Sequence, residues 1–458
     1  AMTRPKHFDP LPQLKGSQAD AVRPDAQIWL SASAGAGKTQ VLTARVLRLL
    51  LNGAAPESIL CLTFTKAGAA EMADRVHERL GAWVTLPDPD LRKELYNLGE
   101  DHLGDRLDEA RRLFARVLDA RGGGLRIQTI HSFAQSLLAA FPAEAGLPIG
   151  FRPVEGREES QLREEALASL VAQAEREGQL GTIDRLSFLA RTLGEDAART
   201  LLRRCAQAPD AMEAIGPGVD ARVRNWLGLG ALDVAAHVRA GCADDGFDLA
   251  TLVAVQQMFT SAPGVRLQGL GQHITDWRAR DVEGRVATLD GLMKAWANDE
   301  GQLRENAAWF PKDPRYPDLV GPLHAHFFTL RELLRLEETA QGLIAALTLG
   351  QDYARTYAEA KRVAGVVDFN DLISATVRLL QTPGIGDWIR YKLDQSVDHI
   401  LVDEAQDTNA DQWAIVNALS AEFFAGEGAK ASAQRTIFAV GDFKQAIFGF
   451  QGTDPREF

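Results

Sequence analysis

Short apolar runs alternate with longer amphipathic stretches over roughly the first 145 residues. The runs QIWLSAS (27–33), SILCLTFT (58–65) and LRIQTI (125–130) have the length of buried strands. Each is followed by a segment whose apolar residues recur three and four positions apart, as in a helix. Strands that alternate with helices predict a parallel sheet with both faces covered.

The pattern changes between about Val154 and Ala364. Stretches such as 158–180 and 326–364 keep the helical spacing, and no strand-type alternation of any length occurs. We therefore predict an all-helical domain inserted into the α/β domain, although the scattered Gly, Pro and Trp of about 209–322 give no clear pattern. The α/β pattern returns near Val366, with DHILVDEAQD (398–407) and RTIFAVGDF (435–443) as two further buried strands that end in acidic residues.

Composition narrows the class of protein only slightly. The 458 residues are 46% hydrophobic and 24% charged, which is ordinary for a globular protein. No run of about 18 apolar residues predicts a transmembrane helix, and the N-terminus lacks the apolar core of a signal peptide. The three cysteines, Cys61, Cys205 and Cys242, form no CxxC pair, which argues against a zinc site or disulfide framework and suits a reducing cytoplasm.

The net charge is −12 and the isoelectric point is near 5.3. Nucleic-acid-binding proteins tend to carry basic surfaces, so this balance argues mildly against a nucleic-acid ligand. A local groove decides binding more than the sum over the chain does. The charge is therefore an objection that any nucleic-acid assignment has to meet.

The strongest single signal is ASAGAGKT, between the first predicted strand and its helix. A phosphate-binding P-loop has the pattern GxxxxGK[ST] at this place, and only its first Gly is changed, to Ala32. Lys38 would neutralise the β- and γ-phosphates and Thr39 would ligate Mg²⁺. The backbone N–H groups of the small residues would bind phosphate oxygens. These residues are Ser33, Ala34, Gly35, Ala36 and Gly37. The alternative, a flexible turn with an incidental GKT, leaves the flanking strand and helix unexplained.

A P-loop enzyme also needs an acidic element, and Asp403-Glu404 follows a buried apolar run. Asp403 would hold Mg²⁺, mostly through water, and Glu404 would orient and deprotonate the attacking water. Taken alone, the pair could be a strand that ends in a solvated turn. Together with the P-loop, it predicts an ATPase that uses ATP and Mg²⁺.

Six segments in order resemble the motifs of superfamily 1 DNA helicases of the UvrD/Rep/PcrA group. They are GSQADAV (16–22), LTFTKAGAAEMADRV (62–76), QTIHSFAQSLL (128–138), VVDFNDLI (366–373), DEAQD (403–407) and VGDFKQAIFGFQG (440–452). The resemblance implies an α/β, RecA-like P-loop NTPase domain with a parallel sheet, called 1A, made of residues 1–145 and 366–458. It also implies that a large all-helical insert, domain 1B, occupies residues 146–365.

The resemblance also implies roles for single residues. Gln18 would contact the adenine edge, and Gln445 would bond the γ-phosphate or the attacking water and so couple hydrolysis to DNA. The residues implied to contact single-stranded DNA are Thr63, Thr65, Lys66, His131, Ser132, Phe133, Phe448 and Phe450. Core packing is the alternative for each aromatic residue, and we favour it for Phe64 and Phe133.

Three further positions leave alternatives open. Gln451 stands where the family usually has arginine, which puts one charge contact in question. Asp442 either supports the catalytic loop or caps a turn. Asp368 and Asp371 could pair at a metal, but a turn and helix-cap role is the better interpretation.

Within the group, SASAGAGKT, TIHSFAQSLL and VGDFKQAIFGFQG with Lys before Gln resemble the AddA type. Proteins of that type are helicase subunits of bacterial break-processing helicase–nucleases, which implies single-stranded DNA and a nuclease/helicase subunit of the AddB type as partners. These residues do not contain motifs IV to VI, which carry the arginine finger of a second RecA-like domain. They do not contain a nuclease domain either. We therefore expect a longer parent protein and weak ATP hydrolysis by this segment alone.

Two alternatives remain at this point. The first is a UvrD/Rep-type repair helicase without a nuclease partner. The second is a nucleotide-switched ATPase whose helical insert binds protein. The second suits the acidic charge better but leaves Gln445, Phe448 and Phe450 in one loop unexplained.

Overall fold

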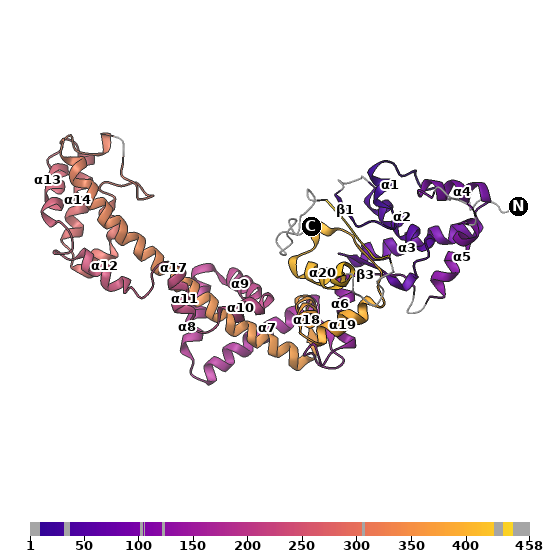
Figure 1. The fold of residues 1–458 in the computed structure, drawn as a ribbon. Coiled ribbons are helices and arrows are strands. Elements are labelled where there is room, and N and C mark those ends of the chain that lie inside the picture. Colours follow the sequence, from indigo (N-terminus) through magenta and orange to yellow (C-terminus); the bar gives the residue numbers. More distant parts are fainter. Residues whose placement is uncertain are drawn as a thin grey trace. The chain divides into compact units, whose positions relative to one another are not determined.

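The computed structural model divides the chain into two compact units (Figure 1). It describes residues 10–31, 37–100, 104, 106–120, 124–304, 307–425 and 434–442. Residues 1–160 and 361–458 form one unit, here called the α/β unit, and residues 161–360 form the other, the helical unit. The naming of domains 1A and 1B, with boundaries at 145/146 and 365/366, stays a prediction.

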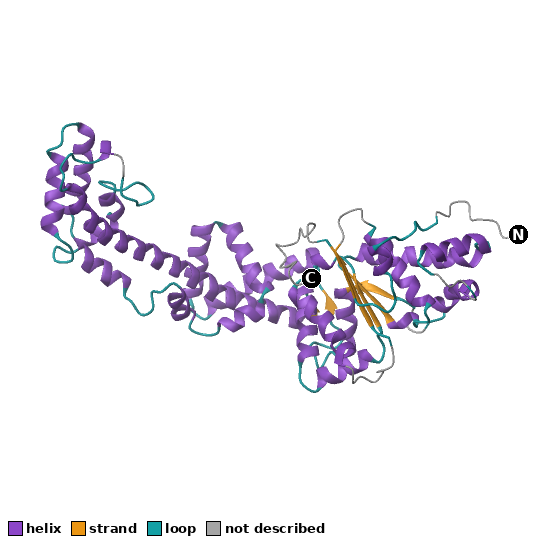
Figure 2. Cartoon of the chain, turned by 45° about the horizontal axis from the view of Figure 1, so that its top comes forward, coloured by secondary structure: helices purple, strands orange, loops and turns teal. Residues whose placement is uncertain are grey.

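A parallel sheet of five strands lies at the centre of the α/β unit (Figure 2). Its order is β1 (Ile28–Ser31), β7 (Thr436–Gly441), β6 (His399–Val402), β2 (Ile59–Thr63) and β3 (Arg126–Thr129). Leu62 is paired with Val402, and Val402 with Ala439, so β2 and β6 end within one residue of each other and β7 continues two residues further. All five predicted strands and the parallel arrangement are confirmed. The carboxyl ends of the strands form one edge of the sheet, here called the carboxyl edge.

Both faces of the sheet are buried, which explains why the strands are continuous apolar runs. Cys61 and Leu401 belong to one core, whereas Leu62 and Ile400 belong to the core on the other face. The first core is completed by α2 (Lys38–Leu51), α3 (Lys66–Thr85), α4 (Asp88–Asn97) and α5 (Arg106–Leu118). The second is completed by α6 (Ile130–Ala140), α18 (Phe369–Gln381), α19 (Ile385–Asp394) and α20 (Ala410–Ala425).

A short parallel pair of strands, β4 (Arg152–Pro153) and β5 (Val366–Val367), lies where the chain leaves the α/β unit and returns to it. Directly after β5, Asp368 caps α18 by accepting from Asp371 N, and the Asp371 carboxylate accepts from Asp368 N in return. Lys361 Nζ bonds both carboxylates, at 2.7 and 2.5 Å. The predicted cap role of the two aspartates is confirmed.

The helical unit is built almost wholly of helices, as predicted. These are α7 (Gly156–Arg176), α8 (Leu180–Leu193), α9 (Glu195–Gln207), α10 (Pro209–Ile215), α11 (Val219–Trp226), α12 (Val234–Cys242), α13 (Leu249–Thr260), α14 (Val265–Arg278), α15 (Val282–Ala287), α16 (Leu289–Met293), η3 (Ala307–Trp309) and α17 (Tyr316–Ala364). Within the described residues 161–304 and 307–360, the only β-type pairing is a bridge between Ala297 and Leu303. Helix α17 contributes to two separate cores of this unit, one with α7 to α9 and one with α11 to α16.

The segment 209–322, which gave no clear pattern, folds around aromatic side chains. Phe327 on α17 packs against Trp277, with ring centroids 5.3 Å apart, and against Trp296 at 6.4 Å. Trp277 Nε1 also donates to the Arg285 carbonyl at 2.8 Å. Long-range packing on α17 therefore orders these short helices where local periodicity is weak.

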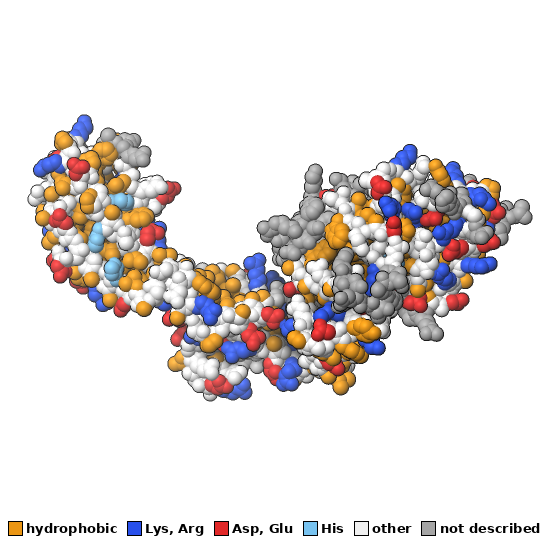
Figure 3. Space-filling model, viewed as in Figure 1, with side chains coloured by type: hydrophobic (Ala, Val, Ile, Leu, Met, Phe, Trp, Pro, Cys, Tyr) orange, Lys and Arg blue, Asp and Glu red, His pale blue; other side chains and the backbone are white. Residues whose placement is uncertain are grey.

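Charged side chains of both signs are interspersed over the visible face of each unit (Figure 3). On that face the acidic excess of the chain does not gather into a single patch. No helix in the part of the chain that the structure describes is long and apolar enough to cross a membrane.

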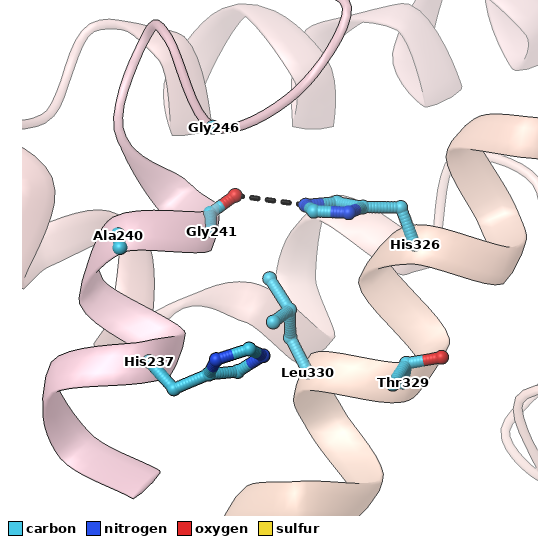
Figure 4. A pocket seen from close by; sticks show the side chains of 7 residues that line it. All are labelled: His237, Ala240, Gly241, Gly246, His326, Thr329 and Leu330. Carbon is cyan, nitrogen blue, oxygen red and sulfur yellow. Dashed lines mark hydrogen bonds between the residues drawn. The ribbon is translucent and has the colours of Figure 1, made fainter. Parts of the chain in front are cut away.

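Helices α12 and α17 of the helical unit pack closely around a hollow of about 360 Å³ (Figure 4). His326 Nε2 donates to the Gly241 carbonyl at 2.9 Å. A Cβ atom at Gly241 would lie 2.8 Å from Leu330 Cδ1, so a larger residue there would have to displace the Leu330 side chain. His237 lines the same hollow, and Leu330 lies between the two imidazoles (Figure 4).

Replacing Lys361 by methionine should strongly destabilise the α/β unit. The Lys361 ammonium is 6% exposed and holds two carboxylates that would otherwise repel each other in a buried site. We expect the free energy of unfolding to fall by about 3–5 kcal/mol, measured by urea denaturation.

The matched control is Arg199→Met. Arg199 also bonds two carboxylates, Glu164 and Glu195, but on the exposed surface. Its loss should change the free energy of unfolding by about 0–1 kcal/mol. Equal losses for the two variants would contradict a special role of the Lys361 cluster.

Candidate functional site

Helix α2 begins at the carboxyl edge with the second half of the predicted P-loop. Gly37 precedes the helix with φ 81°, a left-handed conformation that glycine adopts without steric cost. Lys38 and Thr39 occupy the first turn, where free backbone N–H groups and the helix dipole favour a phosphate. The predicted contacts Ser33, Ala34, Gly35 and Ala36 lie outside the described residues, as does Ala32, which replaces the first Gly of the motif.

Strand β6 ends at Val402 and delivers Asp403 and Glu404 to the same edge. Asp403 N donates to the Leu62 carbonyl at 2.9 Å and so extends the β6–β2 ladder by one residue. Glu404 has φ 51°, and among the described residues other than glycine it alone has a positive φ. Such a conformation costs roughly 1–3 kcal/mol and is typical of functional turns.

The turn brings Glu404 to the P-loop lysine. Lys38 Nζ lies 3.1 Å from Glu404 Oε2, although the two residues are 366 positions apart in the chain. The structure therefore joins the two predicted catalytic groups. A triphosphate bound at the start of α2 would compete with Glu404 for the Lys38 ammonium.

The Asp403 carboxyl group lies in a buried site that disfavours its ionised form. Burial, and then the charge of Glu404, raise the pKa of Asp403 to about 6. The same two causes raise the pKa of Asp407. A divalent cation would relieve this repulsion, and the oxygen donors that Asp403 and Thr39 supply are those that Mg²⁺ prefers. The residues present therefore fit Mg²⁺.

Gln18, the predicted adenine contact, lies on α1 (Ser17–Ala21) beside the end of the P-loop. A Cβ atom at Gly37 would come within 3.5 Å of Gln18 Nε2. The segment after α1 is held by Arg45 of α2, which is buried and donates to the Ala21 and Ala26 carbonyls at 3.3 and 2.6 Å. Burial lowers the pKa of Arg45 to about 10. Arg45 is a further residue of this site that the motifs do not predict, although an arginine on the apolar face of a helix is a visible signal in the sequence.

A second group of residues lies at the β2 and β3 ends of the carboxyl edge. Thr65 caps α3, accepting from Gly68 N at 3.0 Å, and Thr129 caps α6, accepting from Ser132 N at 3.0 Å. Thr63 and Thr129 are paired across the two strands, so the two helix N-termini are neighbours. Neighbouring helix N-termini form a favourable site for phosphate groups.

Lys66 and His131 flank these two helix starts. The Lys66 ammonium is largely exposed, 3.9 Å from Glu155. His131 packs edge-on against Phe369, with ring centroids 5.0 Å apart. Burial, and then the charge of Lys66, lower the pKa of His131, so the neutral imidazole predominates at pH 7. Lys66, His131 and Ser132 are therefore brought together, as a phosphate-binding role requires.

The other predicted DNA contacts are placed differently. Thr63 is buried and its hydroxyl donates to the Thr65 carbonyl at 3.0 Å. Phe133 is 5% exposed and lies in the core, as the packing alternative expects. Outside the described residues lie Gln445, Phe448, Phe450 and Gln451.

The arrangement combines a P-loop-type helix start, an acidic strand end and two neighbouring helix N-termini on one sheet. The sequence profile of the UvrD/REP helicase N-terminal domain matches residues 14–229 and 269–458. The chain belongs to this family. The profile spans both segments of the α/β unit, and residues 230–268, which it leaves unmatched, lie in the helical unit.

Relatives of this UvrD/REP-type domain are named as the AddA subunit of an ATP-dependent helicase/nuclease. The protein of Desulforudis audaxviator (strain MP104C) is 28% identical over 476 residues, which cover 95% of this chain and 35% of the relative. The protein of Moorella thermoacetica is 26% identical over 474 residues, which cover 94% of this chain and 31% of the relative. The protein of Lactobacillus gasseri is 24% identical over 467 residues, which cover 94% of this chain and 35% of the relative. The chain thus spans about a third of the length of the curated relatives it matches.

Asp403→Asn should stabilise this UvrD/REP-type domain at pH 7. The Asp403 pKa is raised from 3.8 to about 6, so the folded state holds the proton more tightly than the unfolded state does. The stability that this tighter proton binding contributes is present at low pH and is lost as pH rises through about 6. We expect the variant to gain about 1–3 kcal/mol in free energy of unfolding at pH 7.

Urea denaturation at pH 7 and at pH 4 tests this. The gain should shrink toward zero at pH 4, where the wild-type carboxyl is protonated in the folded chain. A variant that is less stable than wild type at pH 7 would contradict the conclusion that the ionised Asp403 carboxylate destabilises the fold.

Proposed function

We propose that this chain is the ATP-binding part of an ATP-dependent single-stranded-DNA translocase and helicase that acts in double-strand-break repair and recombination. The observation that carries the proposal is the contact between Lys38 and Glu404 at the carboxyl edge. It places a phosphate-binding ammonium beside the group proposed to activate water, in a family of helicase domains. ATP would lie at the β1, β7 and β6 ends, which is where ligands of parallel α/β sheets bind.

The positions of the side chains support a division of labour in ATP hydrolysis. Lys38 binds the β- and γ-phosphates and Thr39 and Asp403 hold Mg²⁺, which supplies charge stabilisation for phosphoryl transfer when bound. Once Lys38 turns to the phosphates, Glu404 Oε2 is released from its ion pair and can accept a proton from water. Gln18 fixes the base of the nucleotide.

The proposed DNA site is the β2 and β3 end of the same edge. The N-termini of α3 and α6 and the exposed Lys66 would hold backbone phosphates, a contact that does not depend on sequence. Because both sites lie on one sheet, a change at the nucleotide can reach the DNA through a few residues. Contacts from Gln445, Phe448 and Phe450 to phosphate and DNA stay part of the proposal.

The names of the relatives support the choice of pathway. They are AddA subunits of helicase/nucleases, so we infer that the protein containing this chain works with a nuclease/helicase subunit of the AddB type, in the cytoplasm. The acidic net charge is a weak objection to this proposal, because a DNA site needs only local cations and the exposed Lys66 supplies one.

Lys38→Ala should weaken the binding of Mg²⁺-ATP by about 100-fold, since a charged contact to phosphate is worth about 1.5–3 kcal/mol. Isothermal titration calorimetry of the purified chain measures the dissociation constant. Lys93→Ala, which removes an exposed lysine from α4, is the control and should bind ATP normally. Unchanged affinity in Lys38→Ala would refute the phosphate-site assignment.

Binding of an oligo(dT) strand should weaken steeply with salt, because each neutralised phosphate releases counterions. Lys66→Ala should lower the slope of log K against log [salt] by about 0.7, the share of one single-strand phosphate contact. Fluorescence anisotropy between 50 and 300 mM salt gives the slope, and Lys93→Ala again serves as control. Undetectable or salt-independent binding would favour a nucleotide-switched, protein-binding ATPase.

A further inference from the structure

Gln406 joins two parts of the carboxyl edge that otherwise belong to different strands. It is a buried residue of the short helix η4 (Ala405–Asp407), which follows β6. Its Nε2 donates to Glu404 Oε2 at 2.7 Å, the same oxygen that accepts from Lys38. Its Oε1 accepts from Asp442 N, the first residue after β7, at 2.8 Å.

The partners fix which way the Gln406 amide points. Asp442 N can only donate, and the Glu404 carboxylate only accepts, so the oxygen must face β7 and the nitrogen must face the acid. Nε2 also lies 3.3 Å from Asp407 Oδ2. Of the amide, carboxylate and apolar side chains of this size, only an amide can donate at one end and accept at the other.

The contact with β7 leaves no free space. A Cβ atom at Gly441 would lie 2.8 Å from Gln406 Oε1 and 3.1 Å from Gln406 N. Any side chain at 441 would therefore displace the amide. The Gln406 side chain is therefore packed directly against the end of β7.

We propose that Gln406 is a positioning residue that couples the nucleotide site to the end of β7, and through it to DNA affinity. The proposal rests on the proposed function. Among the described residues, Glu404 Oε2 accepts from two donors, Lys38 and Gln406. When phosphate takes Lys38, the bond from Gln406 is the one of these two that remains. A shift of the Glu404 carboxylate is then transmitted to Asp442 N, where β7 leads into residues 443–458 that carry the predicted DNA contacts.

The coupling can be measured as the factor by which Mg²⁺ and a non-hydrolysable ATP analogue change the dissociation constant of oligo(dT). Site–site coupling in proteins is typically 5- to 150-fold, and it is the same when DNA is added first. In Gln406→Met, which keeps the volume but loses both hydrogen bonds, the factor should fall to within twofold of one. Gly441→Ala should lower it from the other side of the contact.

Gln412→Met is the matched control. Gln412 is also buried, and its Oε1 also accepts from a backbone N–H, that of Asn409 at 3.1 Å, but at the start of α20. This variant should lose thermal stability and keep the coupling factor, which separates coupling from simple destabilisation. Should Gln406→Met fail to fold, Gln406→Glu serves instead, because it still accepts from Asp442 N and repels Glu404.

The outcomes separate the two levels of the account. Gln406 and Gly441 variants that keep the full wild-type factor would overturn the role of Gln406 and leave the proposed function intact. A wild-type chain that binds ATP and DNA independently would likewise overturn the coupling alone. A wild-type chain that binds no ATP would overturn the proposed function and the coupling with it.

Discussion

The parallel register of the five strands decides where each functional group of the α/β unit lies. Because the strands are parallel and in register, residues that follow different strands meet along one edge: Lys38 with Glu404, and Gln406 with Asp442. The hydrophobic burial of both sheet faces holds this register, since a slip by one residue would exchange the two cores. The chemistry of the edge therefore depends on packing that itself contains no functional group.

The same edge concentrates features that weaken the fold. Asp403 and Asp407 are acids whose pKa is raised by burial, and Glu404 has a strained backbone. Each is unfavourable for stability, and the proposed function gives Asp403 and Glu404 a use, in holding Mg²⁺ and activating water. The Lys361 cluster shows the opposite use of buried charge: there, the two carboxylates have their cation within the chain and serve only to fix α18.

Much of this arrangement could be predicted from the sequence, because its signals are local. Apolar runs of strand length locate β1 and β6 without a structure. The GKT after the first run and the acids after the fourth locate Lys38 and Glu404. The roles of Gln406 and Arg45 could not be predicted this way, since they come from contacts with Asp442 and with the Ala21 and Ala26 carbonyls. For Arg45 the sequence offers only the signal of an arginine on an apolar helix face. The short helices of 209–322 were hidden for a similar reason: packing around Phe327, and not periodicity, orders them.

The most direct test of the central claim is a crystal structure of the chain with Mg²⁺ and a non-hydrolysable ATP analogue. The account predicts that Lys38 Nζ leaves Glu404 Oε2, now 3.1 Å away, and bonds a β- or γ-phosphate oxygen. Glu404 should then hold a water molecule near the γ-phosphate while Gln406 keeps its bond to Asp442 N. Nucleotide bound elsewhere, with the Lys38–Glu404 ion pair intact, would contradict the account.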